Sequence, residues 1–374
     1  MRIAVLVSAM NRGGAERVAA TLANAWVAAG HEVVLIATWS GRGGCDYALD
    51  PGVELRFLAD SPRRMPSYLG RVLALRGMLR DLRADVAVSF LTNVNIMTLL
   101  ATRGMRLPVV VNERIDPLAN QEKNPGLEFL RRRLYRFADV VTVQTDTGIS
   151  RLQSCVPGMQ KVVAVANPIP QDLQEIDVPA PDMSAAGPRI VGMGRLSPQK
   201  QWDHLLEAIA QVAKDTPGAE LVIWGAGSER SCLTKRVRSL GLEESARLPG
   251  NTDDPWGELR KADVFVLCSA YEGFPNVLLE AMAIGLPCVT YDCPTGPAEL
   301  TEHGKVAVLL PLGDRQGLAE AIGRLLADDS WRTELGKAAR QSVMARYSLS
   351  SVLRQWDEVL LYALTRARPI AAQP

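Results

Sequence analysis

Short apolar runs alternate with amphipathic segments along most of this chain of 374 residues. The runs are rich in Val and Ile and hold few polar residues, as in IAVLV at 3–7 and VFVLC at 264–268. Strands with this composition are buried on both faces of a sheet, and helices between them return the chain to the same edge. The sequence therefore predicts an α/β fold with parallel sheets that are covered by helices on both faces.

Residues 168–188 interrupt this alternation, because they contain five prolines, four acidic residues and no long apolar run. Such a composition is typical of a linker between domains. The alternation restarts after it, so we expect two doubly wound domains that repeat an architecture rather than a sequence. The predicted parts are a first domain at 1–168, a linker at 169–188, a second domain at 189–346, and a terminal helix and tail at 347–374.

Individual elements follow from the same pattern, since short apolar runs predict strands and longer segments with a 3.6-residue period predict helices. The predicted strands lie at 3–7, 33–37, 86–90, 109–111, 140–144, 189–193, 221–224, 264–268 and 288–291. The predicted helices lie at 15–29, 202–212, 229–240, 277–283, 318–327, 331–345 and 350–364.

The two halves of the chain differ in charge. Residues 1–170 hold 21 Lys and Arg against 14 Asp and Glu, a net +7, whereas 171–374 hold 21 against 27, a net −6. A basic half indicates an anionic partner, such as a membrane surface, a polyphosphate or nucleic acid, or else ordinary solvated surface. Two basic stretches with interleaved apolar residues, 62–83 and 131–136, suit either an anionic bilayer or ordinary helices with a solvated basic face.

The six cysteines form no C-x-x-C pair, so neither a zinc site nor a disulfide framework is expected, and a reducing cytoplasm fits their use. The first apolar run is too short for a signal peptide, and no window of 18 apolar residues occurs. We therefore expect a cytoplasmic protein without a spanning helix.

A glycine-rich turn, N-R-G-G-A-E at 11–16, follows the first predicted strand and opens a helix. Ligands of open α/β sheets bind at the carboxyl ends of the strands. Gly13 and Gly14 allow close backbone approach, and a helix N-terminus offers N–H groups to an anion. This turn predicts diphosphate binding, or simply a tight turn; its spacing does not match G-x-G-x-x-G.

Two cations leave the end of the first strand of the second domain, in G-R-L-S-P-Q-K at 194–200. Arg195 can bind phosphate oxygens in a bidentate manner, and Lys200 supplies a compact charge. Together they could neutralise a departing diphosphate, although a solvated loop with two ordinary charges would look the same.

Two acids lie eight residues apart in the segment 270–287. Glu272 follows a predicted strand, and Glu280 lies about one turn inside the next helix. Carboxylates accept hydrogen bonds from hydroxyls and so suit a sugar or a ribose. The alternatives are a carboxylate favoured by the helix dipole for Glu272 and a buried acid with a structural partner for Glu280.

Taken together, four motifs resemble the retaining glycosyltransferases of family 4, and the match covers nearly the whole chain. They are GGAE at 13–16, G-R-L-x-x-x-K at 194–200, the E-x7-E pair within EGFPNVLLEAMAIGLP, and DCPTGPAE at 292–299. The resemblance implies the GT-B fold: two Rossmann-like doubly wound parallel-sheet domains that face each other across a cleft, with a C-terminal helix that crosses back to the first domain.

The resemblance also implies roles at the matching positions. Arg195 and Lys200 would bind the donor diphosphate and stabilise it as the leaving group, and Glu280 would bond the ribose. Glu272 would hold the donor sugar and distal phosphate, while the base would lie near 249–251. The other implied donor contacts are Gly13, Gly14, Gly194, Pro249, Gly250, Phe274, Pro275, Asn276 and Val277. No metal ion or cofactor is implied.

One departure from the family concerns a histidine that many members carry after the fourth strand of the first domain. This chain has N-E-R-I-D-P at 112–117 instead, and none of its three histidines is a good substitute. Glu113 and Arg114 therefore become the candidates for catalytic groups near the sugar.

The acceptor follows from the bacterial enzymes that this chain resembles, which extend lipid-linked oligosaccharides. They imply transfer of a hexose or N-acetylhexosamine from a UDP-sugar to a glycan or polyprenyl-diphosphate-linked glycan, with peripheral contact at the inner membrane surface. No nucleic-acid partner is implied. Three alternatives stay open: a non-catalytic nucleotide- or sugar-binding protein, a GT-B sugar-nucleotide epimerase, and an oxidoreductase suggested by W-G-A-G at 224–227, whose third glycine is replaced by Arg230.

Overall fold

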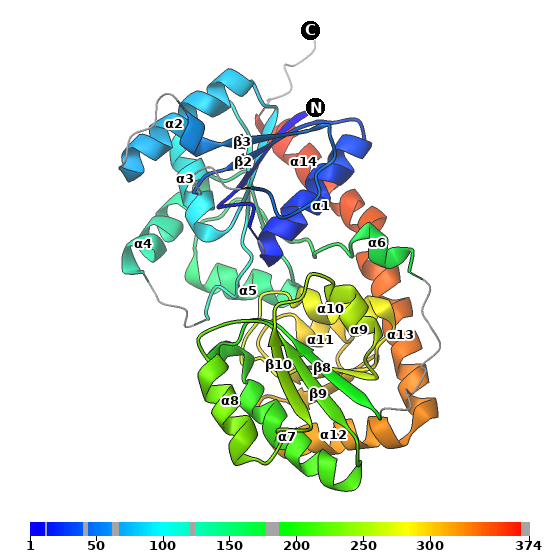
Figure 1. Cartoon of the computed structure of the whole chain (residues 1–374). Helices are drawn as coiled ribbons and strands as arrows, with labels where there is room; N and C mark the ends of the chain where they lie inside the picture. Colours follow the sequence, from blue (N-terminus) through cyan, green and yellow to red (C-terminus); the bar gives the residue numbers. More distant parts are fainter. Residues whose placement is uncertain (12, 40–43, 62–66, 120–123, 177–186, 368–374) are drawn as a thin grey trace. The chain divides into compact units, whose positions relative to one another are not determined.

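The computed structural model describes residues 1–11, 13–39, 44–61, 67–119, 124–176 and 187–367 (Figure 1). It divides into two compact units, Met1–Pro168 with Leu349–Pro374, and Ile169–Ser348. Part of the predicted linker, 177–186, lies outside the described residues, and so does 62–66 of the first basic stretch.

The first unit is built on a seven-stranded parallel sheet with the order β3-β2-β1-β4-β5-β6-β7. Its strands are β1 Arg2–Val7, β2 Glu32–Ala37, β3 Val53–Phe57, β4 Val86–Phe90, β5 Val109–Asn112, β6 Val140–Val143 and β7 Val162–Ala164. Its helices are α1 Gly14–Ala28, α2 Tyr68–Leu82, α3 Thr92–Thr102, α4 Pro125–Leu134, α5 Asp146–Cys155 and α14 Leu349–Ala367, with 3-10 turns η1 Leu58–Asp60 and η2 Tyr135–Phe137.

Two hydrophobic cores cover the two faces of this sheet. On one face α1 and α14 pack together, with the rings of Trp26 and Trp356 5.6 Å apart and Phe90 beside them. On the other face α2, α3, η2 and α5 share a second core. The last helix therefore completes the first unit although it follows the second in sequence (Figure 1), which confirms the prediction of a returning C-terminal helix.

The second unit contains a six-stranded parallel sheet with the order β10-β9-β8-β11-β12-β13. Its strands are β8 Arg189–Met193, β9 Glu220–Trp224, β10 Ala246–Gly250, β11 Val264–Leu267, β12 Cys288–Asp292 and β13 Val308–Pro311. Its helices are α6 Gln171–Gln174, α7 Trp202–Asp215, α8 Arg230–Ser239, α9 Pro255–Arg260, α10 Asn276–Ile284, α11 Pro297–Leu300, α12 Arg315–Ala327 and α13 Asp329–Tyr347, with a 3-10 turn η3 Pro198–Lys200. Helices α7, α8 and α12 share one core with the strands, and α10 packs on α9 and α13.

The sheets confirm the predicted pair of doubly wound α/β units, and they correct it at the edges. The strands β3, β7, β10 and β13 are the edge strands, and none was predicted. Each is short or half-exposed, so its sequence lacks the continuous apolar run of a central strand. Pro249 and Gly250, which the resemblance places near the base, are the last two residues of β10.

Candidate functional site

The loops at the carboxyl ends of β8, β9 and β10 are bonded to one another. Gly194 N donates to Trp224 O at 2.9 Å, and Gly225 N donates to Gly250 O at 2.7 Å. A Cβ on Gly225 would lie 1.9 Å from Gly194 O, and the φ of Gly225 is 142°. Only glycine fits such an approach. The W-G-A-G segment is thus explained by strand-end packing, without a dinucleotide ligand.

Two of the predicted motifs meet in an ion pair. Lys200 Nζ lies 2.6 Å from Glu272 Oε1, and both residues are buried. Lys200 follows β8, whereas Glu272 follows β11, which is the neighbouring strand. The side-chain amide of Gln199 also donates to Tyr271 O at 2.7 Å, so the two loops are fixed to each other twice. These contacts hold an ammonium group and a carboxylate at adjacent strand ends.

The 292–299 segment packs against the same loop. The hydroxyl of Thr295 donates to the carbonyl oxygen of Glu272. Gly296 has a φ of 95°, and a Cβ there would lie 2.6 Å from Pro275 Cδ. The structure therefore brings three of the four motifs together: 194–200, 270–287 and 292–299.

Glu280 lies one turn inside α10, which begins at Asn276 without a side-chain cap. The side chain of Glu280 is 3% exposed, and its Oε2 accepts a hydrogen bond from Trp256 Nε1 at 3.1 Å. Trp256 lies on α9, directly after β10, and the sequence patterns did not single it out. Phe274, just before α10, packs on Tyr347 with ring centroids 5.7 Å apart.

Arg195 is arranged differently from Lys200. Its carbonyl oxygen accepts from Trp202 Nε1 at 3.0 Å, which fixes the backbone of the loop. Its side chain is exposed and forms no hydrogen bond or ion pair with another residue that the structure describes. The guanidinium is therefore available to an anion.

The glycine-rich turn of the first unit forms the start of α1. Gly13 is the N-cap, and the hydroxyl of Tyr47 accepts from Gly13 N at 2.6 Å and donates to Gly13 O at 2.7 Å. Gly14 is the first residue of the helix. The carboxylate of Glu16 lies close to Gly13, where a Cβ would be 2.2 Å from its Oε2. Arg12 lies outside the described residues.

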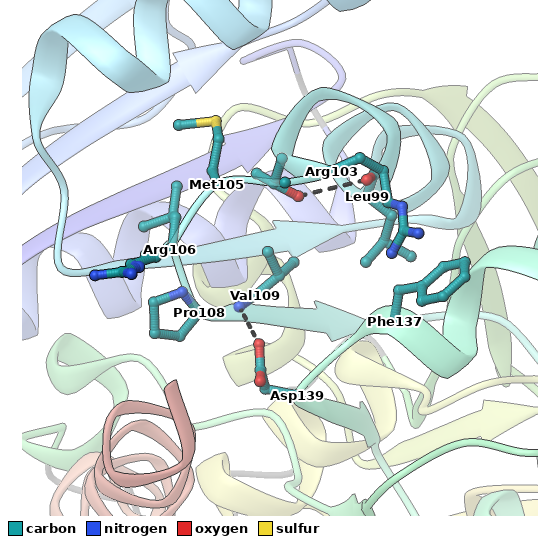
Figure 2. A pocket seen from close by; sticks show the side chains of 11 residues that line it. Leu99, Arg103, Met105, Arg106, Pro108, Val109, Phe137 and Asp139 are labelled. Atoms are coloured by element: carbon teal, nitrogen blue, oxygen red, sulfur yellow. Dashed lines mark hydrogen bonds between the residues drawn. The ribbon is translucent and has the colours of Figure 1, made fainter. Parts of the chain in front are cut away.

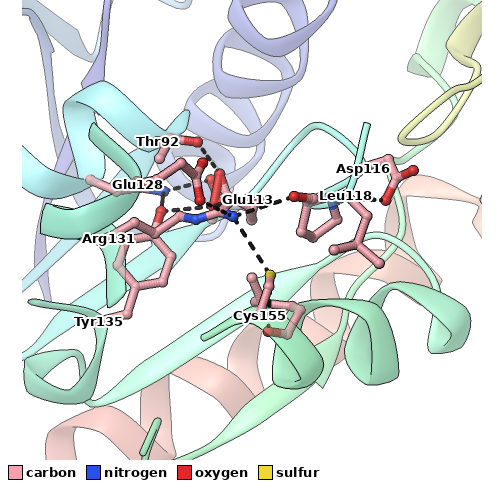
Figure 3. A network of polar contacts seen from close by, with 12 residues as sticks. Thr92, Glu113, Asp116, Leu118, Glu128, Arg131, Tyr135 and Cys155 are labelled. Carbon is pink, nitrogen blue, oxygen red and sulfur yellow. Dashed lines mark hydrogen bonds and ion pairs between the residues drawn. The ribbon is translucent and has the colours of Figure 1, made fainter. Parts of the chain in front are cut away.

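The buried Glu113 side chain lies in a network of polar contacts (Figure 3) with Tyr135, which belongs to the core that α2, α3, η2 and α5 share. Its carboxylate accepts hydrogen bonds from Tyr135 at 2.8 Å and from Thr92, and lies 3.7 Å from Arg131 Nη1. Burial raises the pKa of Glu113, while Arg131 and the two hydroxyls act in the opposite direction. Arg131, the first residue of the second basic stretch, is therefore an interior group rather than part of a solvated face; Arg132 is exposed.

Arg114 and Asp116, the other charged residues of 113–116, have separate partners. Asp116 accepts two hydrogen bonds from Arg151, at 2.8 and 2.7 Å. Arg114 donates to Asn167 Oδ1, and its guanidinium lies 4.8 Å from the ring centroid of Phe90. Burial lowers the pKa of Arg114 to about 9.

A pocket of about 290 Å³ opens at the other end of β5 (Figure 2). Its wall includes Arg103, stacked 3.7 Å from the Phe137 ring centroid, and Asp139, whose Oδ2 accepts from Val109 N at 2.8 Å. Val109 is the first residue of β5, so this pocket lies at the amino edge of the sheet. It contains none of the predicted site residues.

Within the described part of the chain, no three His, Cys, Asp or Glu side chains gather in a way that could hold a metal ion. Across the same residues, no helix combines the length and apolarity needed to cross a bilayer.

The chain matches two glycosyltransferase domain families. Residues 13–168 match the glycosyl transferase 4-like domain, and residues 182–342 match the glycosyl transferases group 1 domain. Together with the two doubly wound sheets, these matches show that the chain belongs to the glycosyltransferases of the GT-B fold.

The chain is also similar to individual proteins and solved structures. The chain is 28% identical over 367 residues to the GalNAc-α-(1→4)-GalNAc-α-(1→3)-diNAcBac-PP-undecaprenol α-1,4-N-acetyl-D-galactosaminyltransferase of Campylobacter jejuni, covering 96% of this chain and 98% of that protein. It is 37% identical over 207 residues to an exopolysaccharide phosphotransferase of Streptomyces coelicolor, which is 55% of this chain and 21% of that protein. Anabaena HepE in complex with UDP and glucose has a TM-score of 0.80 at 20% identity, covering 96% of this chain and 99% of that one.

Proposed function

We propose that this glycosyltransferase is a retaining enzyme that moves a hexose or N-acetylhexosamine from a UDP-sugar to a glycan carried on a polyprenyl diphosphate. The observation that carries the proposal is the buried Lys200–Glu272 pair at the strand ends of the second unit, directly before the start of α10.

The donor diphosphate is proposed to bind where positive charge converges. Lys200 supplies an ammonium group, Arg195 supplies an exposed guanidinium, and the start of α10 supplies backbone N–H groups without a competing side-chain cap. As the bond to the anomeric carbon breaks, negative charge grows on the diphosphate, and groups held in place beforehand stabilise it. In this scheme the protein's own cations neutralise the leaving group, without a metal ion.

The nucleoside and the sugar of the donor are proposed to lie on opposite sides of the diphosphate. Glu280, which accepts a hydrogen bond from Trp256, would also accept hydrogen bonds from the ribose, and the base would lie along the end of β10 at Pro249 and Gly250. The donor sugar would contact Glu272 and the backbone of 274–277. Gly194, which is hydrogen-bonded to the end of β9, would lie beside the donor phosphates.

The first unit is proposed to supply further substrate contacts from its strand ends. Gly13 and Gly14 would contact the donor phosphates at the start of α1. Glu113 has its carboxylate in the core, so we assign it the role of positioning the loop, and Arg114 the role of meeting substrate. The UDP bound to HepE and the undecaprenyl-diphosphate glycan in the name of the Campylobacter enzyme support the donor and acceptor classes.

A lipid-linked acceptor requires the enzyme to work at a membrane surface, and we propose a peripheral contact on the cytoplasmic face. Helix α2 exposes Tyr68, Leu69 and Leu73, with exposed fractions of 44%, 66% and 49%, and the basic side chain of Arg80 lies further along it. Phe129 on α4 is 57% exposed next to Arg132 and Arg133. Apolar side chains among basic ones suit an anionic bilayer.

The proposal is tested with purified protein, a panel of nucleotide sugars, and polyprenyl-diphosphate glycans added or omitted. We expect one UDP-sugar to release UDP only when the acceptor is present, and NMR of the product to show an α linkage from the α-configured donor. A β linkage would contradict the retaining mechanism. Nucleotide binding without any transfer would favour a binding protein, and an epimerised sugar formed without acceptor would favour an epimerase.

A further inference from the structure

The three charged residues at 113–116, directly after β5, differ in how their charges are compensated. Glu113 has Arg131 at 3.7 Å, and Asp116 has Arg151 at 2.7 Å. Arg114 has no carboxylate within ion-pair distance among the residues that the structure describes. Among the described residues, the segment 113–116 therefore holds two acids in ion pairs and one cation without a counter-charge.

The immediate partners of Arg114 are neutral. One guanidinium nitrogen donates to Asn167 Oδ1, the guanidinium carbon lies 4.8 Å from the Phe90 ring centroid, and the Nε is buried without a partner in the described structure. Burial alone lowers the pKa of this arginine to about 9. Keeping a half-buried cation whose Nε–H group has no partner in the described structure costs free energy unless an anion binds to it.

A second unsatisfied group lies two residues earlier. Asn112 ends β5 fully buried, and neither its amide nitrogen nor its amide oxygen has a hydrogen-bond partner among the described residues. Side chains two positions apart in an extended strand share a face. Phe90, opposite Asn112 in the sheet register and in contact with Arg114, belongs to the core that α1 and α14 cover, so this is the face on which α1 begins.

We infer that Arg114, with Asn112 beside it at the carboxyl end of β5, forms a preformed site for an anionic group of a substrate, phosphate or carboxylate oxygens. The inference deepens the proposed function and rests on it for the identity of the substrate. Two sources of such oxygens exist in that reaction: the diphosphate of the donor, and a phosphate, diphosphate or uronate on the acceptor.

Calorimetry on the full chain separates these sources. UDP is titrated into wild type, Arg114→Met, Arg114→Lys and the control Arg56→Gln, which removes a surface arginine paired with Glu54 at 2.6 Å. Inorganic pyrophosphate is then titrated into each protein saturated with UDP, so that it reports on a site other than the donor diphosphate site.

We expect Arg114→Met to weaken one of these affinities about tenfold, with partial recovery in Arg114→Lys and no change in the control. Loss of UDP affinity would assign the anion to the donor. Loss of pyrophosphate affinity in the UDP-saturated protein, with UDP affinity intact, would assign it to the acceptor. Wild-type affinities for both ligands in Arg114→Met would overturn the inference.

Asn167→Asp provides a second test that keeps the arginine in place. The new carboxylate has nearly the shape of the amide and would pair with Arg114, so the same affinity should fall about tenfold while the melting temperature is kept. Unchanged affinity in this variant would overturn the inference even if Arg114→Met fails to fold. If wild type shows Arg114-dependent anion binding but transfers no sugar, the anion site stands and the proposed function fails.

Discussion

Lys200 and Glu272, 72 residues apart in sequence, form a 2.6 Å ion pair between the loops that follow β8 and β11. Each loop is also bonded to a further strand end, through Gly194 to β9 and through the Glu272 carbonyl to Thr295 after β12. The pair therefore lies at the centre of the strand-end assembly of the second unit. It orients a cation that we assign to the leaving diphosphate.

Removing one partner of this pair should destabilise the fold. Glu272→Gln leaves the buried ammonium of Lys200 without a counter-charge, so we expect the free energy of unfolding to fall by about 2–3 kcal/mol. Chemical denaturation measures it. In the double variant with Lys200→Met, the free energy of unfolding should fall by less than the sum of the two single decreases, because no unpaired charge is left. Additive decreases would show that the two residues are not coupled.

Gly225 should tolerate no side chain. Alanine there would place Cβ 1.9 Å from Gly194 O at a φ of 142°, so we expect a loss of about 3 kcal/mol in the free energy of unfolding. Gly323→Ala is the matched control, because it lies inside α12 with nothing within 4 Å of the new Cβ. That change should stabilise the protein by about 0.5–1 kcal/mol. Equal melting temperatures for the two variants would contradict the strand-end packing.

The buried carboxylate of Glu113 should matter for stability as well as for the loop. Glu113→Ala removes the buried counter-charge of Arg131 and leaves it with Glu128, a partly exposed carboxylate 2.8 Å away, so we expect a loss of about 2–3 kcal/mol in the free energy of unfolding. As a control, Arg132→Ala removes an exposed charge next to Arg131 on α4. It should change the free energy of unfolding by less than about 0.5 kcal/mol. If Glu113→Ala keeps wild-type stability but abolishes transfer, Glu113 acts directly on substrate rather than by positioning.

Stability should fall in mild acid because of His204. Its Nε2 lies 2.8 Å from Arg315 Nη2, and its Nδ1 lies 3.3 Å from the Tyr291 hydroxyl. Burial lowers the pKa of His204 below 6.5; Asp203 opposes the shift, Arg315 adds to it, and Glu207 opposes it. The unfolded chain then binds the proton more readily, so stability is full above pH 6.5 and is lost as pH falls through the lowered pKa.

The measurement is chemical denaturation of wild type and His204→Gln at about pH 7.5 and about pH 5.5. For each protein, the decrease in the free energy of unfolding between the two pH values is calculated. Groups other than His204 titrate in both proteins, so the difference between the two decreases is due to this histidine. We expect the decrease in the free energy of unfolding to be smaller in His204→Gln than in wild type. A decrease as large as that of wild type would mean that His204 does not contribute to the loss of stability in acid.

Membrane contact should depend on the exposed face of α2. Leu69→Asp places a negative charge among side chains that we propose contact an anionic bilayer. We therefore expect the affinity for anionic vesicles, measured by co-sedimentation, to fall at least about tenfold. Leu361→Asp is the control, since Leu361 is 63% exposed on α14 of the same unit. Equal binding by both variants would remove α2 from the proposed membrane surface.

The central strands of both sheets were predictable because each is buried on two faces and its sequence is continuously apolar, as in β1 and β11. The edge strands were not, because they alternate or mix polar residues: β3 reads VELRF and β10 reads ARLPG. Their assignment depends on hydrogen bonds to a neighbouring strand, which no local pattern encodes.

The candidate site was predictable only as separate motifs. The sequence placed Lys200 and Glu272 at strand ends, but their contact depends on β8 and β11 being neighbours, and strand order is a tertiary property. For Glu113 the sequence was misleading. Its position at a strand end suggests contact with substrate, whereas its side chain is buried in the core. Arg131 was read as part of a basic stretch because burial of one arginine among four cannot be told from composition.

The most direct test of the account is the rate of UDP release by Lys200→Met with saturating UDP-sugar and acceptor, compared with wild type and with Lys235→Met, which alters an exposed lysine on α8. The account predicts a fall of about 10²–10³ for Lys200→Met and none for the control, because the leaving diphosphate loses its buried cation. Wild-type release by Lys200→Met would contradict the assignment of Lys200 to the leaving group, and with it the placement of the donor site.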